Sequence, residues 1–394
     1  MKVKAILITS LSMIALFAGC RAQVEEAKPA YDTPLPPGQH ALRKITDPAM
    51  IPDFTIACLN VADLQPAIAN SLSYLSKPSS EGFFPSGQIT HQMAVDSLET
   101  FSDMLDSGVR GSDLNAMIRA RFDVYMSVGC DDRGTVLFTG YYTPIFNGSR
   151  ERTDRFQYPL YLQPEDLVKG PNGEILGRRG YDGAVTPYPP RSVIESTGMM
   201  KGRELIWLED RFEVYIAHVQ GSAKIRLPDG SLVTVGYSAS NGRPYRSVGQ
   251  ELVKDGLISS DQLSLSGMIQ FFKQRPELVP QYVQRNPRYV FFRMEDGPPR
   301  GSLNEPVTPM RTIATDKSIF PRGCLTFIST QLPQAVGGVV VNDAYTGFAL
   351  DQDTGGAIRA PGRCDVYMGV GELAGKRAGQ TYQEGKLYYL FLKQ

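Results

Sequence analysis

The last third of the chain is a succession of short apolar segments separated by turns. These segments are Tyr289–Arg293, Cys324–Ser329, Gly338–Val341, Ala349–Asp351, Asp365–Gly369 and Leu387–Leu392. Amphipathic helices do not alternate with them, whereas the strands of a doubly wound parallel sheet need such helices as crossovers. The pattern therefore argues against a doubly wound sheet and predicts an all-β barrel at the C-terminus.

Further strands and a few helices are predicted upstream. Strand-like runs occupy Thr135–Tyr142 and Phe212–Gly236, the second around a Pro-Asp-Gly turn. Helical patterns cover Val61–Leu75 and Gln92–Leu105, and two more helices are expected over Ser247–Leu252 and Gly267–Lys273. The predicted fold class is mainly β with some α.

The N-terminus has the successive regions of a bacterial lipoprotein signal. Lys2 and Lys4 precede an apolar run from Ala5 to Phe17, which is too short to cross a bilayer. Small residues then lead to Cys20, as in the lipobox of bacterial lipoproteins, where cleavage precedes an acylated cysteine. We therefore predict a signal peptide over residues 1–19 and a lipid anchor on Cys20.

The residues after Cys20 suggest where the anchored chain is located. Arg21 rather than Asp follows the cysteine, which points to the outer membrane. Residues 20–46 are rich in proline and are interpreted as an extended linker. No later segment is long and apolar enough to cross a membrane. We expect a lipoprotein tethered at the periplasmic face of the outer membrane of a Gram-negative bacterium.

Four more cysteines follow the one assigned to lipid. An even number in an oxidising compartment favours disulfides, and four cysteines allow three pairings. Proximity in the sequence favours Cys58 with Cys130 and Cys324 with Cys364. Buried free thiols are the alternative.

Charge and histidine content limit the partners. Lys+Arg and Asp+Glu number 41 each, so the chain has no basic excess with which to neutralise the phosphates of a nucleic acid. The cysteine spacings lack a CxxC motif, and the histidines are only His40, His91 and His218. We therefore expect no nucleic-acid partner and no metal centre.

Carboxylates and glycines gather in one β-rich stretch. Asp351 and Asp353 lead into Gly355 and Gly356, Asp365 follows within a dozen residues, and a further acid, Asp316, lies upstream. Asp353-Thr354-Gly355 matches the signature of aspartic proteases, but its single copy would require a symmetric homodimer. Alternatively, a carboxylic acid with a raised pKa protonates a departing sugar oxygen. Spacing alone leaves both chemistries open.

Several motifs in order resemble those of one known family, the membrane-bound lytic murein transglycosylase A family. They are Thr139-Gly140-Tyr141-Tyr142-Thr143-Pro144, Phe156-Gln157-Tyr158-Pro159-Leu160-Tyr161, His218-Val219-Gln220-Gly221-Ser222, Asn241-Gly242-Arg243-Pro244-Tyr245-Arg246-Ser247-Val248-Gly249 and Asn286-Pro287-Arg288-Tyr289-Val290-Phe291-Phe292. The C-terminal part resembles the family's "3D" domain, whose three aspartates match Asp316, Asp353 and Asp365. Motifs that recur in order are far more specific than any single one.

The resemblance implies a fold. A large domain built on a double-psi β-barrel would comprise residues 47–144 and 243–394, with the 3D domain at about 305–394. A smaller β-domain over residues 145–242 would be inserted into it. The groove between the two domains would hold a glycan strand, as clefts between domains commonly hold ligands.

The resemblance also implies an activity. The family cleaves the β-1,4 bond between N-acetylmuramic acid and N-acetylglucosamine in peptidoglycan, and the C6 hydroxyl attacks C1 to give a 1,6-anhydro product. Because this nucleophile is intramolecular, one carboxylate serves as acid and then as base. Asp365 matches the catalytic aspartate, and Asp353 and Asp316 would support it. No cofactor is implied.

Further motif residues are candidates for glycan binding, and each could instead be structural. They are Tyr141, Tyr142, Thr143, Gln220, Gly221, Ser222, Tyr245, Gly355 and Gly356, with Gly221 expected at a strand position. His218 is interpreted as a structural histidine, because the reaction has no role for it.

Two other functions stay open. The same barrel could be a non-catalytic peptidoglycan-binding module, as in expansin-like proteins, or Asp353 could belong to the aspartic protease named above. The expected partners are peptidoglycan glycan strands, the outer membrane through the lipid anchor, and other cell-wall enzymes.

Overall fold

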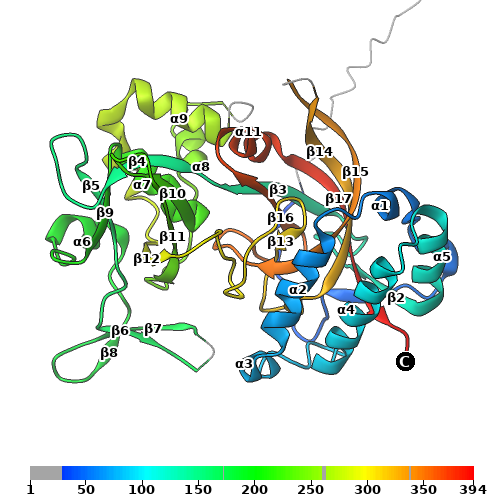
Figure 1. Cartoon of the computed structure of the whole chain (residues 1–394). Coiled ribbons are helices and arrows are strands. Elements are labelled where there is room, and N and C mark those ends of the chain that lie inside the picture. Colours follow the sequence, from blue (N-terminus) through cyan, green and yellow to red (C-terminus); the bar gives the residue numbers. More distant parts are fainter. Residues whose placement is uncertain (1–28, 172, 260–262, 337–338) are drawn as a thin grey trace, which may run out of the picture.

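Six strands close into a β-barrel on the right of Figure 1. The computed structural model describes residues 29–171, 173–259, 263–336 and 339–394. In ring order the strands are β3 (Val136–Thr143), β17 (Tyr382–Leu392), β14 (Leu325–Val336), β15 (Val339–Asp353), β13 (Thr312–Ala314) and β16 (Arg363–Val370), which pairs again with β3. The pairs β13–β15 and β16–β3 are parallel, and the other pairs are antiparallel. The predicted mainly β fold with a barrel is confirmed.

Apolar side chains that point inward from alternate positions of the strands fill the barrel core. Phe327 on β14 pairs with Phe348 on β15, and Leu325 pairs with Leu350, so that apolar residues of the two strands stack inward. These four side chains are fully or almost fully buried. The predicted segment Ala349–Asp351 and residues 339–341 of the predicted segment Gly338–Val341 belong to the single long strand β15, and Gly338 lies outside the described residues.

Helices from the N-terminal third cover the barrel (Figure 1). They are the short η1 (Pro48–Met50), α1 (Thr55–Leu59), α2 (Leu64–Leu75), α3 (Pro78–Glu81), α4 (His91–Asp106) and α5 (Gly111–Arg121). The predictions for α2 and α4 are confirmed, and Thr90 caps α4 by accepting a hydrogen bond from the Met93 amide. Helix α5 was not predicted.

The barrel sheet extends toward the N-terminus into the segment that was predicted to be a linker. Strand β2 (Phe122–Ser127) pairs with β17, and β1 (Leu42–Lys44) pairs with β2. The linker prediction over residues 20–46 is therefore wrong at its end, because residues 42–44 form a strand. The signal peptide and Cys20 lie outside the described residues. Within the described part of the chain, no helix is long and apolar enough to span a bilayer.

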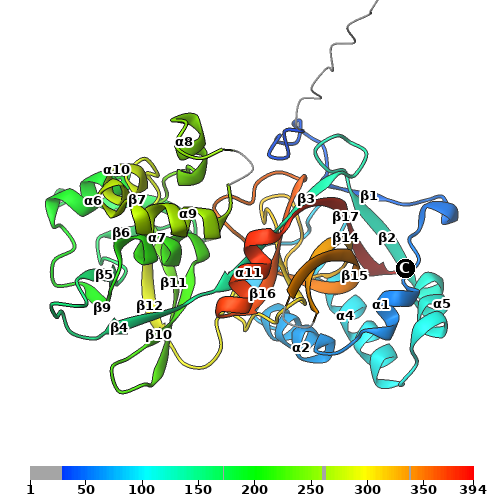
Figure 2. The same cartoon turned by 90° about the horizontal axis from the view of Figure 1, so that it is seen from above.

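A second unit lies beside the barrel (Figure 2). Its main sheet has the order β12 (Val290–Glu295), β11 (Leu232–Ser240), β10 (Ser222–Arg226), β4 (Ile145–Ser149), β9 (Glu204–Leu208) and β5 (Tyr158–Tyr161). A small sheet of β6 (Leu167–Lys169), β7 (Ile175–Arg179) and β8 (Val185–Thr186) projects from it. Its helices are α6 (Arg191–Thr197), α7 (Arg211–Gln220), α8 (Val248–Lys254), α9 (Leu265–Gln274), the short η3 (Pro276–Leu278) and α10 (Val279–Val283).

The second unit is longer than the inserted domain predicted over residues 145–242. Strand β12 hydrogen-bonds with β11, and α8, α9 and α10 contribute Leu252, Phe272 and Tyr282 to the core of this unit. The boundary prediction is corrected on this basis: the chain returns to the barrel only after about Glu295.

Two secondary-structure predictions are wrong. Residues 212–220 of the run Phe212–Gly236 belong to helix α7, which Asp210 caps by accepting hydrogen bonds from two backbone amides and whose C-cap is Gly221 with φ +77°. Gly221 therefore ends a helix and does not lie in a strand. Helix α11 (Glu372–Gln380) also interrupts the predicted all-β segment, between β16 and β17.

The disulfide prediction is wrong as well. Cys58, Cys130, Cys324 and Cys364 are all unpaired thiols. Cys58 is buried in α1, whereas Cys130 lies against Gly362 in a different part of the barrel, so proximity in the sequence gives no proximity in space. Cys324, directly before β14, and Cys364, on β16, are fully buried, and β14 and β16 are not neighbours in the barrel.

Candidate functional site

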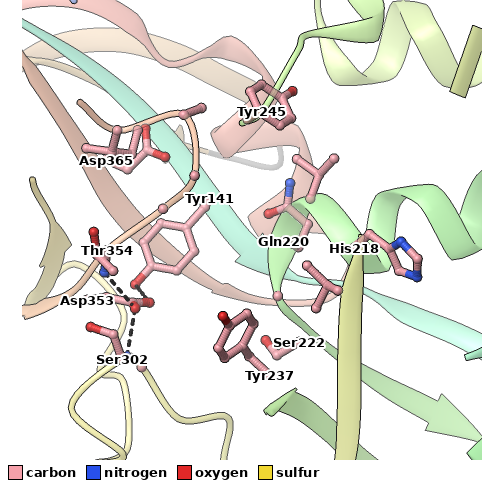
Figure 3. A pocket seen from close by; sticks show the side chains of 18 of the residues that line it. Tyr141, His218, Gln220, Ser222, Tyr237, Tyr245, Ser302, Asp353, Thr354 and Asp365 are labelled. Atoms are coloured by element: carbon pink, nitrogen blue, oxygen red, sulfur yellow. Dashed lines mark hydrogen bonds between the residues drawn. The ribbon is translucent and has the colours of Figure 1, made fainter. Parts of the chain in front are cut away.

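A cleft of about 510 Å³ lies between the barrel and the second unit. Strands β3, β15 and β16 form its barrel side, while α7, the chain around Tyr245 and the strands β11 and β12 form the opposite side. This volume is typical of ligand pockets, and its place between two structural units is a common one. Figure 3 shows the side chains that face one another across it.

Asp365 is one of two aspartates that line the barrel side of the cleft, together with Asp353. Strand β16 places it beside Thr139 on β3, with which it pairs in register, and the Thr139 hydroxyl donates a hydrogen bond to its Oδ1. Burial, opposed by the positive charge of Arg363 and assisted by the negative charge of Asp353, raises its pKa to about 6. Asp365 therefore carries a proton in most molecules at mildly acidic pH and in a minority at neutral pH.

Asp353 lies in the same cleft but has its oxygens occupied. Its Oδ1 accepts hydrogen bonds from the Ser302 and Thr354 amides at 2.8 Å each, and its Oδ2 accepts one from the Tyr141 hydroxyl at 2.8 Å (Figure 3). Burial raises its pKa, and these hydrogen bonds oppose the rise. Asp353 is therefore fixed in position by three donors.

Asp316 does not line the cleft. It is buried, and its Oδ1 accepts hydrogen bonds from the Ser318 amide and hydroxyl. Its Oδ2 accepts one from the Ala360 amide at 3.0 Å, so the carboxylate fastens the loop that carries the two glycines to the chain after β13. The prediction of a catalytic role for Asp316 is thus not matched by its position.

A further acid, Asp351, forms a polar cluster inside the barrel. It is fully buried and pairs with Lys317, while Thr315 and Tyr389 donate hydrogen bonds of 2.7 Å to its Oδ2. Its oxygens are satisfied by protein groups, and it does not line the cleft. The sequence singled out Asp351 only as part of the acidic stretch.

Seven of the nine predicted glycan-binding residues line the cleft. They are Tyr141, Gln220, Gly221, Ser222, Tyr245, Gly355 and Gly356. Because side chains alternate along β3, Tyr141 faces the cleft and Tyr142 packs against Gly375 of α11. Thr143 is fully buried and bonds to Tyr367 and Ser222, so it supports the wall from behind. Tyr142 and Thr143 therefore do not line the cleft, and the predictions that they contact a glycan directly are wrong.

Helix α7 and its end shape the wall of the second unit. The Gln220 side chain accepts a hydrogen bond from the Tyr142 amide at 3.0 Å, which links α7 to β3 across the two units. His218 is buried on the same helix, and its Nδ1 contacts the Arg191 guanidinium at 2.9 Å. Burial and Arg191 hold the pKa of His218 well below its usual range, so the ring is neutral. The His218 ring packs edge-on against the Tyr289 ring, with 4.4 Å between the ring centroids, which fits the structural role predicted for His218.

The arginines of the cleft were not predicted as site residues. The lining includes Arg191, Arg288, Arg293, Arg300 and Arg359, together with Glu295. They come from separate elements of both units, and no local motif groups them. Only the short motif that contains Arg288 gave a signal, and it was interpreted as a family marker. Within the described ranges, no group of three or more His, Cys, Asp or Glu side chains could hold a metal ion.

Similarity to known proteins agrees with this arrangement. The family model of the MltA specific insert domain matches residues 137–293, and that of the 3D domain matches residues 311–391. Membrane-bound lytic murein transglycosylase A of Escherichia coli K12 is 30% identical over 284 residues, which are 71% of this chain and 72% of that protein. The chain belongs to the MltA family.

Solved structures of MltA-type enzymes share the fold. The membrane-bound lytic murein transglycosylase of Agrobacterium tumefaciens superposes with a TM-score of 0.74 at 24% identity, covering 89% of this chain and 98% of that one. Escherichia coli MltA with bound chitohexaose superposes with a TM-score of 0.68 at 24% identity, covering 93% and 97%. Both likenesses extend over the barrel and the second unit.

Proposed function

We propose that this MltA-family chain is a lytic transglycosylase that cleaves the β-1,4 bond between N-acetylmuramic acid and N-acetylglucosamine without water. The product would be a 1,6-anhydromuramoyl end, and Asp365 would be the single acid and base. The observation that carries the proposal is a carboxyl in the cleft between two units whose pKa is raised to about 6. The glycan chitohexaose is bound in the relative from Escherichia coli.

Asp365 would act in two successive steps. The neutral carboxyl first donates its proton to the departing N-acetylglucosamine oxygen as the glycosidic bond breaks. The resulting carboxylate then accepts the proton of the C6 hydroxyl as that oxygen bonds to C1 of the same muramoyl residue. The proton returns to Asp365, so the enzyme ends in its starting state and no water is consumed.

The surroundings of Asp353 support a mechanism with one carboxylate. A hydrolase usually needs a second carboxylate that is free to activate water. Asp353 is held by the Ser302 and Thr354 amides and by the Tyr141 hydroxyl, which leaves it a positioning role. Its negative charge also keeps the proton on Asp365. Asp316 would act only by holding the glycine loop.

The cleft walls offer the contacts that a sugar chain needs. Tyr141 and Tyr245 present aromatic faces and hydroxyls, and Gln220 and Ser222 present polar groups from the opposite wall (Figure 3). Gly355 and Gly356 line the cleft from the loop that follows β15. We assign these residues to glycan binding.

The cellular location of the enzyme is inferred from its N-terminal sequence. We propose that Cys20 carries a lipid and holds the enzyme at the periplasmic face of the outer membrane, where it would reach peptidoglycan and other cell-wall enzymes. Replacement of Cys20 by Ala should release the protein from membrane fractions without changing its activity. Unchanged membrane association of that variant would contradict the anchor.

Digestion of purified peptidoglycan in H₂¹⁸O, followed by mass spectrometry, tests the reaction. The proposal predicts anhydromuramoyl ends without ¹⁸O, and loss of cleavage in Asp365→Asn. Asp229→Asn, which changes an exposed turn that does not line the cleft, is the matched control and should retain full activity. Reducing ends that carry ¹⁸O would indicate a hydrolase, and uncleaved strands with retained binding would indicate a binding module.

A further inference from the structure

The cleft contains a guanidinium that a neutral sugar chain does not require. Arg288 precedes β12 in the second unit and extends over the loop that follows β15 in the barrel. A Cβ atom on Gly356 would lie 2.9 Å from its Nε and 3.2 Å from its Cδ. The absence of a side chain at Gly356 therefore leaves the space in which Arg288 crosses from one unit to the other.

Among the described residues, Arg288 has no acidic partner, unlike three of the four other arginines that line the cleft; the fourth, Arg300, donates a hydrogen bond to the Asn304 carbonyl at 2.7 Å. Arg191 forms an ion pair with Glu195 at 3.1 Å, Arg293 with Glu295 at 2.8 Å, and Arg359 approaches Asp316 at 3.6 Å. Among the residues that the structure describes, no carboxylate pairs with Arg288.

The surroundings of Arg288 make an unpaired charge costly. Burial lowers its pKa, the neighbouring Tyr237 hydroxyl opposes this change, and the positive charge of Arg359 adds to the lowering. A partly buried guanidinium next to a like charge is unfavourable unless an anion joins it. A ligand carboxylate that enters the cleft would supply that anion, and the planar guanidinium can hold both of its oxygens.

We propose that Arg288 binds a carboxylate carried by the muramoyl residue of the substrate, and so makes the enzyme prefer peptidoglycan over a neutral glycan. This inference rests on the proposed function. The muramoyl residue offers such a group in two forms: a free lactyl carboxylate on strands without peptides, or the acidic side chains and C-terminus of the attached stem peptide. N-acetylglucosamine polymers offer neither.

Binding measurements by calorimetry test this assignment in the Asp365→Asn background, in which the substrate should not be consumed. The ligands are chitohexaose, a peptide-free N-acetylglucosamine–N-acetylmuramic acid oligosaccharide, and the same oligosaccharide with stem peptides. Arg288→Gln should weaken binding of at least one anionic ligand about tenfold and leave chitohexaose binding nearly unchanged. The ligand that loses affinity identifies which carboxylate is bound.

Two further variants separate charge recognition from general damage to the cleft. Arg288→Lys keeps a charge without the planar fork and should recover part of the lost affinity. Arg133→Gln removes an exposed arginine outside the cleft and should bind all three ligands as the parent does. An equal loss for all three ligands in Arg288→Gln, or a loss for none, would overturn the assignment.

Failure of this inference is distinct from failure of the proposed function. Continued turnover by Asp365→Asn would refute the role of Asp365, and binding would then be measured on a time scale shorter than cleavage. The comparison of neutral with anionic ligands would still decide the role of Arg288.

Discussion

Replacing Asp365 by Asn should stabilise the protein at neutral pH while it abolishes cleavage. The wild-type carboxyl has a pKa of about 6 in the folded chain against the ordinary 3.8. Below pH 3.8 the carboxyl is neutral in both states and costs nothing. As the pH rises toward 6, the unfolded carboxyl loses its proton and the folded one keeps it, so stability falls.

The size of the effect follows from the same two pKa values. Each unit of pKa difference corresponds to about 1.4 kcal/mol, so the full cost of the wild-type carboxyl above pH 6 is about 3 kcal/mol. The Asn side chain is neutral at every pH and has no such cost. The stability gap between variant and wild type should therefore grow by about 2 kcal/mol between pH 4.5 and pH 7.5.

Urea unfolding of both proteins at these two pH values measures the gap. Asp229→Asn is a control in which the stability difference should change with pH in the opposite direction. The Ser231 hydroxyl and amide lower the pKa of the exposed Asp229. In that pair the wild type should gain stability over the variant as the pH rises. A gap for Asp365→Asn that does not change with pH would refute the claim that burial raises the pKa of Asp365.

Three further predictions follow from the site and the barrel. The kcat/KM of the wild type should fall about tenfold between pH 5 and pH 7 as Asp365 loses its proton, and a flat profile measured on soluble glycan strands would contradict its role as acid. Gly356→Ala should displace the Arg288 side chain and weaken binding of the anionic oligosaccharide while urea unfolding stays within about 0.5 kcal/mol of wild type, and unchanged affinity in calorimetry would show that Arg288 does not need this space. Tyr389→Phe should cost about 1–3 kcal/mol in urea unfolding, because Asp351 loses a buried donor, and a cost near zero would show that the other partners of Asp351 suffice.

The barrel could be predicted because each of its strands has a recognisable local sequence pattern. Segments such as Asp365–Gly369 are short, apolar and bounded by turns, and the absence of intervening helical periodicity excluded a doubly wound sheet. Helix α7 was missed although its signals were present. Asp210 at its start and Gly221 at its end are ordinary cap residues, but the apolar alternation of the following strands was extended across them.

The candidate site could be predicted only in part, for a reason of geometry. Family motifs marked Asp365 and Asp353, and both lie in the cleft. Alternation along β3 turns Tyr142 away from the cleft, and one residue of register decides this. The approach of Arg288 to Gly356 joins residues of two units, so no sequence window contains it.

The incorrect disulfide pairs have a similar origin. Loop length gives the entropy of closing a disulfide but not the geometry of the two thiols. Cys58 is in a helix that packs on the barrel, and Cys130 is in a turn next to Gly362. The fold thus decides which thiols could meet, and sequence distance does not.

The protonation state of Asp365 is the central claim, and an NMR titration of ¹³C-carboxyl-labelled aspartates measures it directly. Spectra of the wild type and of Asp365→Asn between pH 4 and pH 8 identify the resonance of this side chain by its loss in the variant. We expect a midpoint near pH 6. A midpoint at or below pH 4 would mean that Asp365 is fully ionised at neutral pH and cannot donate the proton on which the mechanism depends.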